Sequence, residues 1–306
     1  MAVATVRSRR QFLRDAGITG AGFALLGTAC SSGGQAAEVQ LVRLFSSDRV
    51  VVAGIEQRLP FGVVANGAPV VGEGSSVNVS VLFNGETIEE ITVPSRVVNH
   101  DHVEGEGEIP HEHADIQRYF PMRTTLPEPG IYDLEVDIDG QRIPMPVQAF
   151  AANDVKIVTA GQPFPALITP TLAMPEPMDS ICTLFDGPCP FHEHTVADVL
   201  ADGDPLAFLI ATPQFCSTSY CGPVVETLIE AADSFPSVRP IHLEVYENTD
   251  EANGSLSNLR AASQLAEIGL DFEPSLFLVG RDGIVADRID NVFDRAELEL
   301  ALALIA

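Results

Sequence analysis

An alternation of apolar runs and helix signals in the C-terminal part of the chain most limits what this sequence can fold into. The continuous apolar run 205–211 (Pro-Leu-Ala-Phe-Leu-Ile-Ala) predicts a strand covered on both faces, because a strand with one solvated face alternates apolar and polar residues. Gly222-Pro223 then opens a predicted helix, with proline in the first turn, where its missing N–H is tolerated. The predicted elements follow in the order strand, helix, strand, helix, strand, strand, helix: 205–211, 224–234, 239–246, 256–268, 274–279, 284–289 and 295–305.

Two stretches in this region carry a family resemblance. Cys221-Gly222-Pro223 stands where thioredoxins have Cys-Gly-Pro-Cys, with Val224 in place of the second cysteine. The segments 273–279 (Glu-Pro-Ser-Leu-Phe-Leu-Val) and 282–285 (Asp-Gly-Ile-Val) resemble the family's cis-proline, apolar strand, glycine turn and last strand. Residues 185–306 are therefore identified as similar to the thioredoxin-like family. The resemblance implies an α/β thioredoxin-like domain in which Pro274 is cis and packs beside the redox cysteines.

The region 43–150 has a different pattern, with short alternating runs separated by turn residues. Asn84-Gly85 and Asp139-Gly140 each lie between two such runs and predict β-hairpins. The stretch 130–136 (Gly-Ile-Tyr-Asp-Leu-Glu-Val) resembles the tyrosine corner of immunoglobulin-like sandwiches, in which the Tyr132 hydroxyl would tie a strand to its preceding loop. These features predict an all-β immunoglobulin-like sandwich at 43–150, and the proline-rich segment 151–184 is predicted to be a semi-rigid linker.

The first 30 residues predict an export signal. Residues 8–14 (Ser-Arg-Arg-Gln-Phe-Leu-Arg) are similar to a twin-arginine motif, and the apolar run that follows is too short to span a membrane. That run ends at Cys30, which we predict to be lipidated, with 31–42 as a tether. The alternative is cleavage near Ala36-Ala37 to give a product without an anchor. The favoured reading places the protein at the outer face of the cytoplasmic membrane.

The formal net charge of −26 limits the partners of the chain. A surface this acidic is repelled by nucleic acid and by anionic lipid, so we expect no nucleic-acid binding and contact with the membrane only through the lipid anchor. Exported protein thiols or disulfides are the expected partners.

Four cysteines remain if Cys30 carries lipid, and an exported protein is expected to pair them in disulfides. Three pairings are open. Closeness along the chain favours Cys182 with Cys189, as a structural staple, and Cys216 with Cys221.

Cys216 and Cys221 are the predicted redox centre. A thiol at a helix N-terminus is activated because the unpaired N–H groups favour the thiolate. Cys221 directly precedes the predicted helix, so we expect Cys221 to attack, Cys216 to resolve the mixed disulfide, and Pro274 to shape the peptide-binding edge. In the alternative register Cys216 takes the nucleophile's place. An inert loop-closing disulfide, in a non-enzymatic binding protein, is a further alternative.

Histidines form three His-x-His pairs, each with an acidic residue in the middle: His100 with His102, His111 with His113, and His192 with His194. Residues two apart point the same way on a strand and can chelate one metal ion. The first two pairs flank an acidic loop and could hold copper(II), zinc or nickel. The alternative, slightly favoured because no wider set of ligands is visible, is a solvated acidic loop with clustered histidines. The redox function requires no cofactor. A copper-binding or copper-delivery module that uses the cysteines and histidine pairs is the alternative function.

Overall fold

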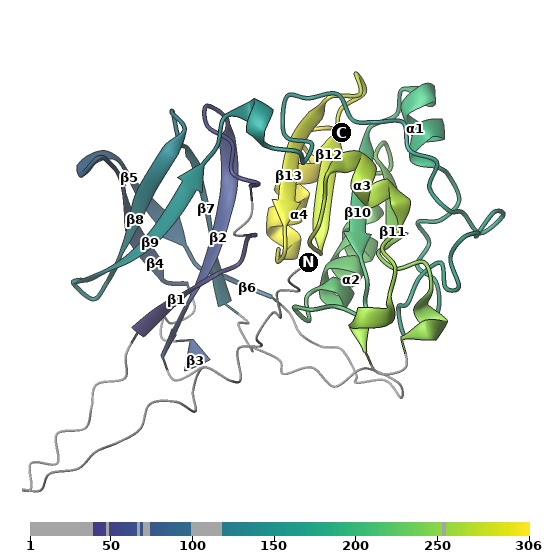
Figure 1. Cartoon of the computed structure of the whole chain (residues 1–306), viewed down its shortest axis with the longest axis horizontal. Coiled ribbons are helices and arrows are strands. Elements are labelled where there is room, and N and C mark those ends of the chain that lie inside the picture. The colour runs from purple at the N-terminus through teal and green to yellow at the C-terminus, as the bar shows by residue number, and fades with distance from the viewer. Residues whose placement is uncertain (1–38, 47–48, 66–67, 70–73, 99–117, 253–254) are drawn as a thin grey trace, which may run out of the picture. The chain divides into compact units, whose positions relative to one another are not determined.

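Short strands separated by turns build the first part of the chain. The computed structural model (Figure 1) describes residues 39–306 except 47–48, 66–67, 70–73, 99–117 and 253–254. One antiparallel sheet has the order β1-β2-β7-β6, with β3 paired to β2: β1 (Val39–Arg43), β2 (Glu56–Ala65), β3 (Ala68–Pro69), β6 (Arg96–Val97) and β7 (Arg118–Thr125). A second antiparallel sheet has the order β5-β4-β8-β9: β4 (Ser76–Phe83), β5 (Glu86–Pro94), β8 (Gly130–Ile138) and β9 (Gln141–Ala149).

Both predicted hairpins of the second sheet are confirmed. Asn84 and Gly85 join β4 to β5 with φ angles of 52° and 82°, and Asp139 and Gly140 join β8 to β9 with φ angles of 53° and 85°. Two consecutive positive φ angles match the twist of the flanking strands, and Asn-Gly and Asp-Gly are the dipeptides that adopt them most readily.

The predicted tyrosine link is also present. The Tyr132 hydroxyl donates to the carbonyl oxygen of Glu128 at 2.8 Å and accepts from the Glu128 N–H at 3.0 Å, while the Tyr132 ring is fully buried. This pair of hydrogen bonds fixes the loop before β8. The assignment of the two sheets to the immunoglobulin-like class stays a prediction.

The C-terminal part contains the predicted succession of strands and helices, preceded by one helix that was not predicted, α1 (Val196–Asp202). Its sheet has the order β11-β10-β12-β13, with β11 parallel to β10 and β12 antiparallel to both of its neighbours. All six residues of β10 are buried, as the continuous apolar run predicted. The elements are α1 (Val196–Asp202), β10 (Leu206–Ala211), α2 (Cys221–Ala232), β11 (Arg239–Glu244), α3 (Ser263–Ile268), β12 (Ser275–Val279), β13 (Val285–Asp290) and α4 (Arg295–Leu302), with single 3-10 turns η2 (Ala152–Asp154), η3 (Thr249–Glu251) and η4 (Leu256–Asn258).

The helix predicted at 256–268 is wrong as one continuous element. It is divided into η4 and α3, and Ala261 between them forms an isolated antiparallel bridge with Tyr246. The N–H of Ala262 also donates to the carbonyl oxygen of Val245 at 2.8 Å. Backbone groups of 261–262 thus form hydrogen bonds with the segment that follows β11 and not within a continuous helix. Tertiary pairing overrides the helical periodicity here.

The proline-rich segment after β9 is packed against the C-terminal sheet. Pro163 bridges Ile284, and the N–H of Phe164 donates to the carbonyl oxygen of Gly283 at 2.8 Å. Phe164 and Leu167 are both buried. Proline cannot donate a backbone hydrogen bond, but the residues between the prolines supply the donors that hold this segment in place.

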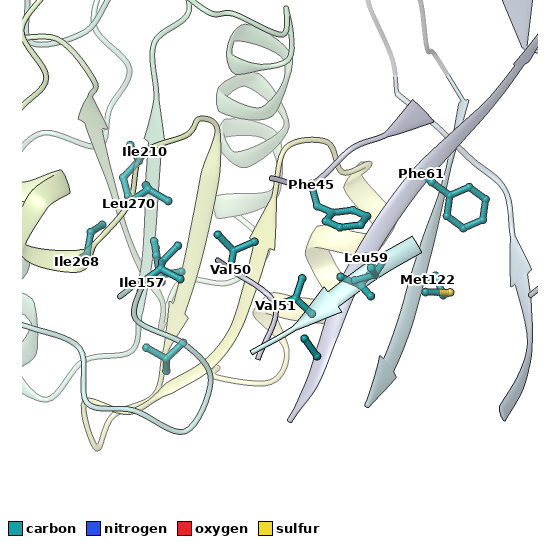
Figure 2. Packing of buried hydrophobic residues seen from close by; sticks show 14 of the residues in the cluster. Phe45, Val50, Val51, Leu59, Phe61, Met122, Ile157, Ile210, Ile268 and Leu270 are labelled. Atoms are coloured by element: carbon teal, nitrogen blue, oxygen red, sulfur yellow. The ribbon is translucent and has the colours of Figure 1, made fainter. Parts of the chain in front are cut away.

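Buried apolar side chains form a large cluster that draws on most of the strands, and Figure 2 shows part of it. Leu59 and Met122 are register partners on β2 and β7, and both are almost completely buried. Ile210 of β10 lies in the same cluster. A second cluster, formed mainly by α2, α4 and the face of the C-terminal sheet that they cover, contains all four described cysteines.

A buried ion pair connects β2 with α4. Arg58 Nε donates to Glu297 Oε1 at 2.7 Å, and the side chains are 1% and 8% exposed. Arg58 also donates to the carbonyl oxygen of Asp290 at 2.9 Å, and the Tyr119 hydroxyl donates to Glu297 at 2.8 Å. The charges are therefore paired and hydrogen-bonded, as burial demands. Among the helices that the structure describes, none is long and apolar enough to cross a membrane.

Candidate functional site

The Cys216–Cys221 pair lies where β10 passes into α2. Strand β10 ends at Ala211, and α2 begins at Cys221 itself. The backbone N–H of Cys221 donates to the sulfur of Cys216 at 3.3 Å. The first N–H groups of a helix have no partner within the helix, so this donor is available to a neighbouring thiolate. The loop turns back toward the helix start at Ser219, which has a φ angle of 64°.

Hydrogen bonds make Cys216 the more acidic thiol of the pair. Burial raises its pKa, but hydrogen bonds from the Cys221 thiol and from Thr218 outweigh burial and bring the pKa of Cys216 down to about 7. The Thr218 hydroxyl oxygen lies 3.4 Å from the Cys216 sulfur. A substantial fraction of Cys216 is therefore thiolate near neutral pH.

Cys221 has the opposite character. Burial, then the neighbouring Cys216, then Glu273 hold the pKa of the Cys221 thiol well above its ordinary value. Cys221 is 0% exposed, whereas Cys216 is 6% exposed. The predicted roles, with Cys221 attacking and Cys216 resolving, do not fit this geometry. The first N–H of α2 donates to the sulfur of Cys216, which precedes the helix. The alternative in which Cys216 is the nucleophile therefore fits the geometry better.

Pro274 follows Glu273, which is hydrogen-bonded to the loop that carries Cys216. The Glu273–Pro274 peptide bond is cis, as the family resemblance implied. Glu273 Oε1 accepts hydrogen bonds from the Ser217 hydroxyl at 2.9 Å and from the Ser217 N–H at 3.3 Å. Because Ser217 is next to Cys216 in the chain, these hydrogen bonds hold the segment before β12 against the loop of Cys216. Burial raises the pKa of Glu273.

Cys182 and Cys189 belong to a second, buried cluster. The sequence predicted them to be a disulfide staple, but in the structure both are free thiols, and so are Cys216 and Cys221. The two thiols converge on His192 and His242, and the ligand atoms of these four residues all lie within 4.8 Å of one another. A buried group of two cysteines and two histidines can hold a metal ion. The predicted staple is thus replaced by a potential metal centre.

Distances within this Cys2His2 cluster are short. The sulfur of Cys189 lies 3.2 Å from His192 Nε2 and 3.4 Å from His242 Nδ1. The sulfur of Cys182 lies 3.6 Å from His242 Nδ1. The hydrogen bond from Cys189 and the neighbouring imidazoles lower the pKa of the Cys182 thiol, and that same hydrogen bond raises the pKa of Cys189.

The predicted pairing of His192 with His194 is wrong. His192 is buried in the cluster, His194 is exposed, and the segment that carries them is not a strand. The partner that sequence reasoning missed is His242, on β11. A signal for the site was present in Cys189-x-x-His192, because two ligands separated by two to four residues are typical of zinc sites.

The remaining predicted sites lie outside the described residues. These are the lipidation site Cys30 and the histidines His100, His102, His111 and His113.

No protein-family model matches this chain, and no curated protein matches it in sequence. A solved structure described as MTB DsbF in its mixed oxidized and reduced forms is similar to part of it, with 19% sequence identity. The match covers 40% of this chain and 90% of the DsbF chain, at a TM-score of 0.29. A likeness this weak carries no argument about the fold or the activity of this chain.

Proposed function

We propose that this chain is a thioredoxin-like thiol–disulfide oxidoreductase that uses Cys216 and Cys221. The observation that carries the proposal is the hydrogen bond of 3.3 Å from the first N–H of α2 to the sulfur of Cys216. This contact stabilises a thiolate on the more accessible cysteine and leaves a second, buried thiol beside it. The parallel β10–α2–β11 unit, followed by the antiparallel β12 and β13, supports the thioredoxin-like assignment.

The exchange begins with the Cys216 thiolate, which attacks one sulfur of a partner disulfide. A Cys216–partner S–S bond forms, the partner's S–S bond breaks, and the departing sulfur keeps the electron pair and takes a proton from solvent. Cys221 then loses its proton to solvent and attacks the Cys216 sulfur. The second partner sulfur leaves and is protonated. In total two electrons and two protons pass to the partner, and the reverse sequence oxidises it.

The substrates are proposed to be exported proteins. This part rests on the leader, whose twin-arginine pattern and Cys30 favour export and lipid anchoring at the outer face of the cytoplasmic membrane. Disulfides form and persist in such an oxidising compartment, so an exchange activity has targets there.

Trapping of the mixed disulfide tests the proposal on the whole chain with a small disulfide-bonded peptide. Cys221→Ser is expected to accumulate the Cys216–peptide adduct, the unaltered protein to resolve it, and Cys216→Ser to form none, as read by mass spectrometry. The proposal fails if Cys216→Ser exchanges as fast as the unaltered protein, or if the Cys216–Cys221 bond, once formed, resists millimolar dithiothreitol.

A further inference from the structure

We propose that Cys182, Cys189, His192 and His242 bind one zinc ion in a closed, tetrahedral site. Three of the ligands come from the segment before α1, and His242 comes from β11. All four residues are buried, with exposed fractions of 8%, 3%, 1% and 1% in that order. This site is separate from the redox pair: the metal-capable group found among the described residues contains neither Cys216 nor Cys221.

The spacing of the donor atoms fits a tetrahedral zinc ion. With Zn–S bonds of about 2.3 Å and Zn–N bonds of about 2.0–2.1 Å, tetrahedral angles place neighbouring sulfur and nitrogen ligands about 3.5 Å apart. Three of the four sulfur–nitrogen distances in the cluster are 3.2, 3.4 and 3.6 Å. Small adjustments of side chains would therefore accommodate the ion.

Hydrogen bonding prepares His242 as a ligand. Its Nε2 lies 3.0 Å from the carbonyl oxygen of Ala211, which can only accept, so Nε2 carries the ring proton in the neutral imidazole. The lone pair is then on Nδ1, the atom that faces the sulfurs of Cys182 and Cys189. A metal-binding histidine typically donates its other N–H to a carbonyl or carboxylate in this way.

Charge and enclosure favour zinc over copper(I), the other ion that suits two thiolates and two imidazoles in tetrahedral geometry. Two thiolates neutralise a Zn²⁺ ion, whereas with Cu⁺ the buried site would keep one net negative charge, and burying unpaired charge is costly. Four protein ligands leave no open position, which is typical of structural zinc sites. The buried Glu244 carboxylate, which accepts a hydrogen bond from Thr183 next to Cys182, adds negative charge and so adds to the preference for the divalent ion.

The ion would fasten an irregular segment to the sheet. Residues 182–192 contain no helix or strand. They lie along the edge of β11, where the N–H of His242 donates to the carbonyl oxygen of Phe191 at 3.1 Å. Thr183 extends this attachment to the redox loop, because its hydroxyl oxygen lies 2.7 Å from Glu244 and accepts from the Gln214 N–H at 3.1 Å. Zinc binding would therefore hold in place the segment that supports the loop of Cys216.

The first test measures metal in the full-length protein, purified without a tag or chelator. Elemental analysis is expected to find about one zinc per chain. His242→Ala is expected to lose the zinc, whereas His194→Ala, which removes an exposed histidine two residues from His192, is expected to keep it. The proposal is overturned if the protein holds no zinc and Cys182 and Cys189 are joined by a disulfide, if copper replaces zinc, or if His194→Ala loses as much zinc as His242→Ala.

A second measurement covers the case in which His242→Ala fails to fold. The unaltered full chain, depleted of zinc under reducing conditions, is titrated with cobalt(II). Four-coordinate thiolate and imidazole ligation is expected to give intense visible absorption bands and sulfur-to-metal charge transfer at one cobalt per chain, both abolished by one equivalent of zinc. A weak, octahedral spectrum, or bands that remain after zinc is added, would overturn the proposal.

Discussion

The Nε2 atom of His242 lies 3.0 Å from the carbonyl oxygen of Ala211, so the last residue of β10 orients a side chain of the Cys2His2 cluster. Ala211 is also where the chain leaves β10 for the loop that carries Cys216. The two groups of cysteines therefore share one strand end. A structural change in the Cys2His2 cluster is therefore expected to alter the position of the Cys216 loop. It would be transmitted by the backbone after Ala211 and by the hydrogen bond between Thr183 and Gln214.

The pH dependence of Cys216 alkylation should show its lowered pKa. Because the thiolate is the nucleophile and the pKa of Cys216 is about 7, the rate is expected to rise with pH, reach half its maximum near pH 7 and level off above it. Cys221, whose pKa is raised, is expected to stay unmodified over this range. Iodoacetamide labelling followed by peptide mass spectrometry measures both, and a Cys216 midpoint above pH 8.5 would contradict the assignment.

Thr218→Val should raise the pKa of Cys216. The substitution removes the hydroxyl that lies 3.4 Å from the sulfur but keeps the shape of the side chain. A loss of about one hydrogen bond to a charged group, roughly 1.5 kcal/mol, corresponds to about one pKa unit. The same alkylation profile measures the shift. Thr227→Val, on the body of α2, serves as the control and should leave the midpoint in place.

Glu273→Gln should make Cys221 easier to ionise. The carboxylate contributes to the raised pKa of Cys221, while its oxygen accepts two bonds from Ser217 that the amide oxygen of glutamine can still accept. Resolution of the mixed disulfide is therefore expected to become faster, because more of Cys221 is then thiolate at a given pH. Stopped-flow kinetics with the disulfide peptide measure this rate. A slower resolution would indicate instead that Glu273 accepts the proton of Cys221.

Breaking the buried pair of Arg58 and Glu297 should destabilise the protein strongly. Arg58→Met leaves a buried carboxylate without its partner, and such a change costs about 3–5 kcal/mol. Adding Glu297→Gln should recover part of that loss, because the orphaned charge is removed. The exposed pair of Arg295 and Glu299 is the control, and its loss should change the free energy of unfolding by less than about 1 kcal/mol. Urea unfolding of Arg58→Met, of Arg58→Met with Glu297→Gln, and of Glu299→Gln for the control pair gives the comparison, and equal losses for the two pairs would contradict it.

Tyr132→Phe should loosen the loop before β8. The hydroxyl makes two hydrogen bonds to the backbone of Glu128, and their loss is expected to cost about 1–2 kcal/mol. The ring stays in place, so the core is unchanged. Urea unfolding should register the loss, and amide hydrogen exchange should increase around Glu128. Unchanged exchange at this loop would contradict the predicted role.

Local patterns allowed much of the fold to be predicted. The buried run of β10, the proline at the start of α2 and the Asn84-Gly85 turn each act over a few residues, and the structure confirms them. The helix predicted at 256–268 is interrupted because Ala261 pairs with Tyr246, which lies beyond the span of that helix. The spacing of apolar residues within 256–268 carries no information about a hydrogen-bonding partner outside that segment.

The sequence by itself determined most of the order of strands and helices, the tight turns and the place of one cysteine before α2 and one at its start, because these follow from side-chain periodicity and backbone preferences. Only the tertiary structure decided which thiol is activated and which residues surround Cys182 and Cys189. Cys182 and His242 are 60 residues apart in the chain, and they meet only when the segment before α1 lies along β11. The activation of Cys216 likewise depends on a helix N–H that points back at a sulfur five residues earlier. Both are consequences of packing geometry.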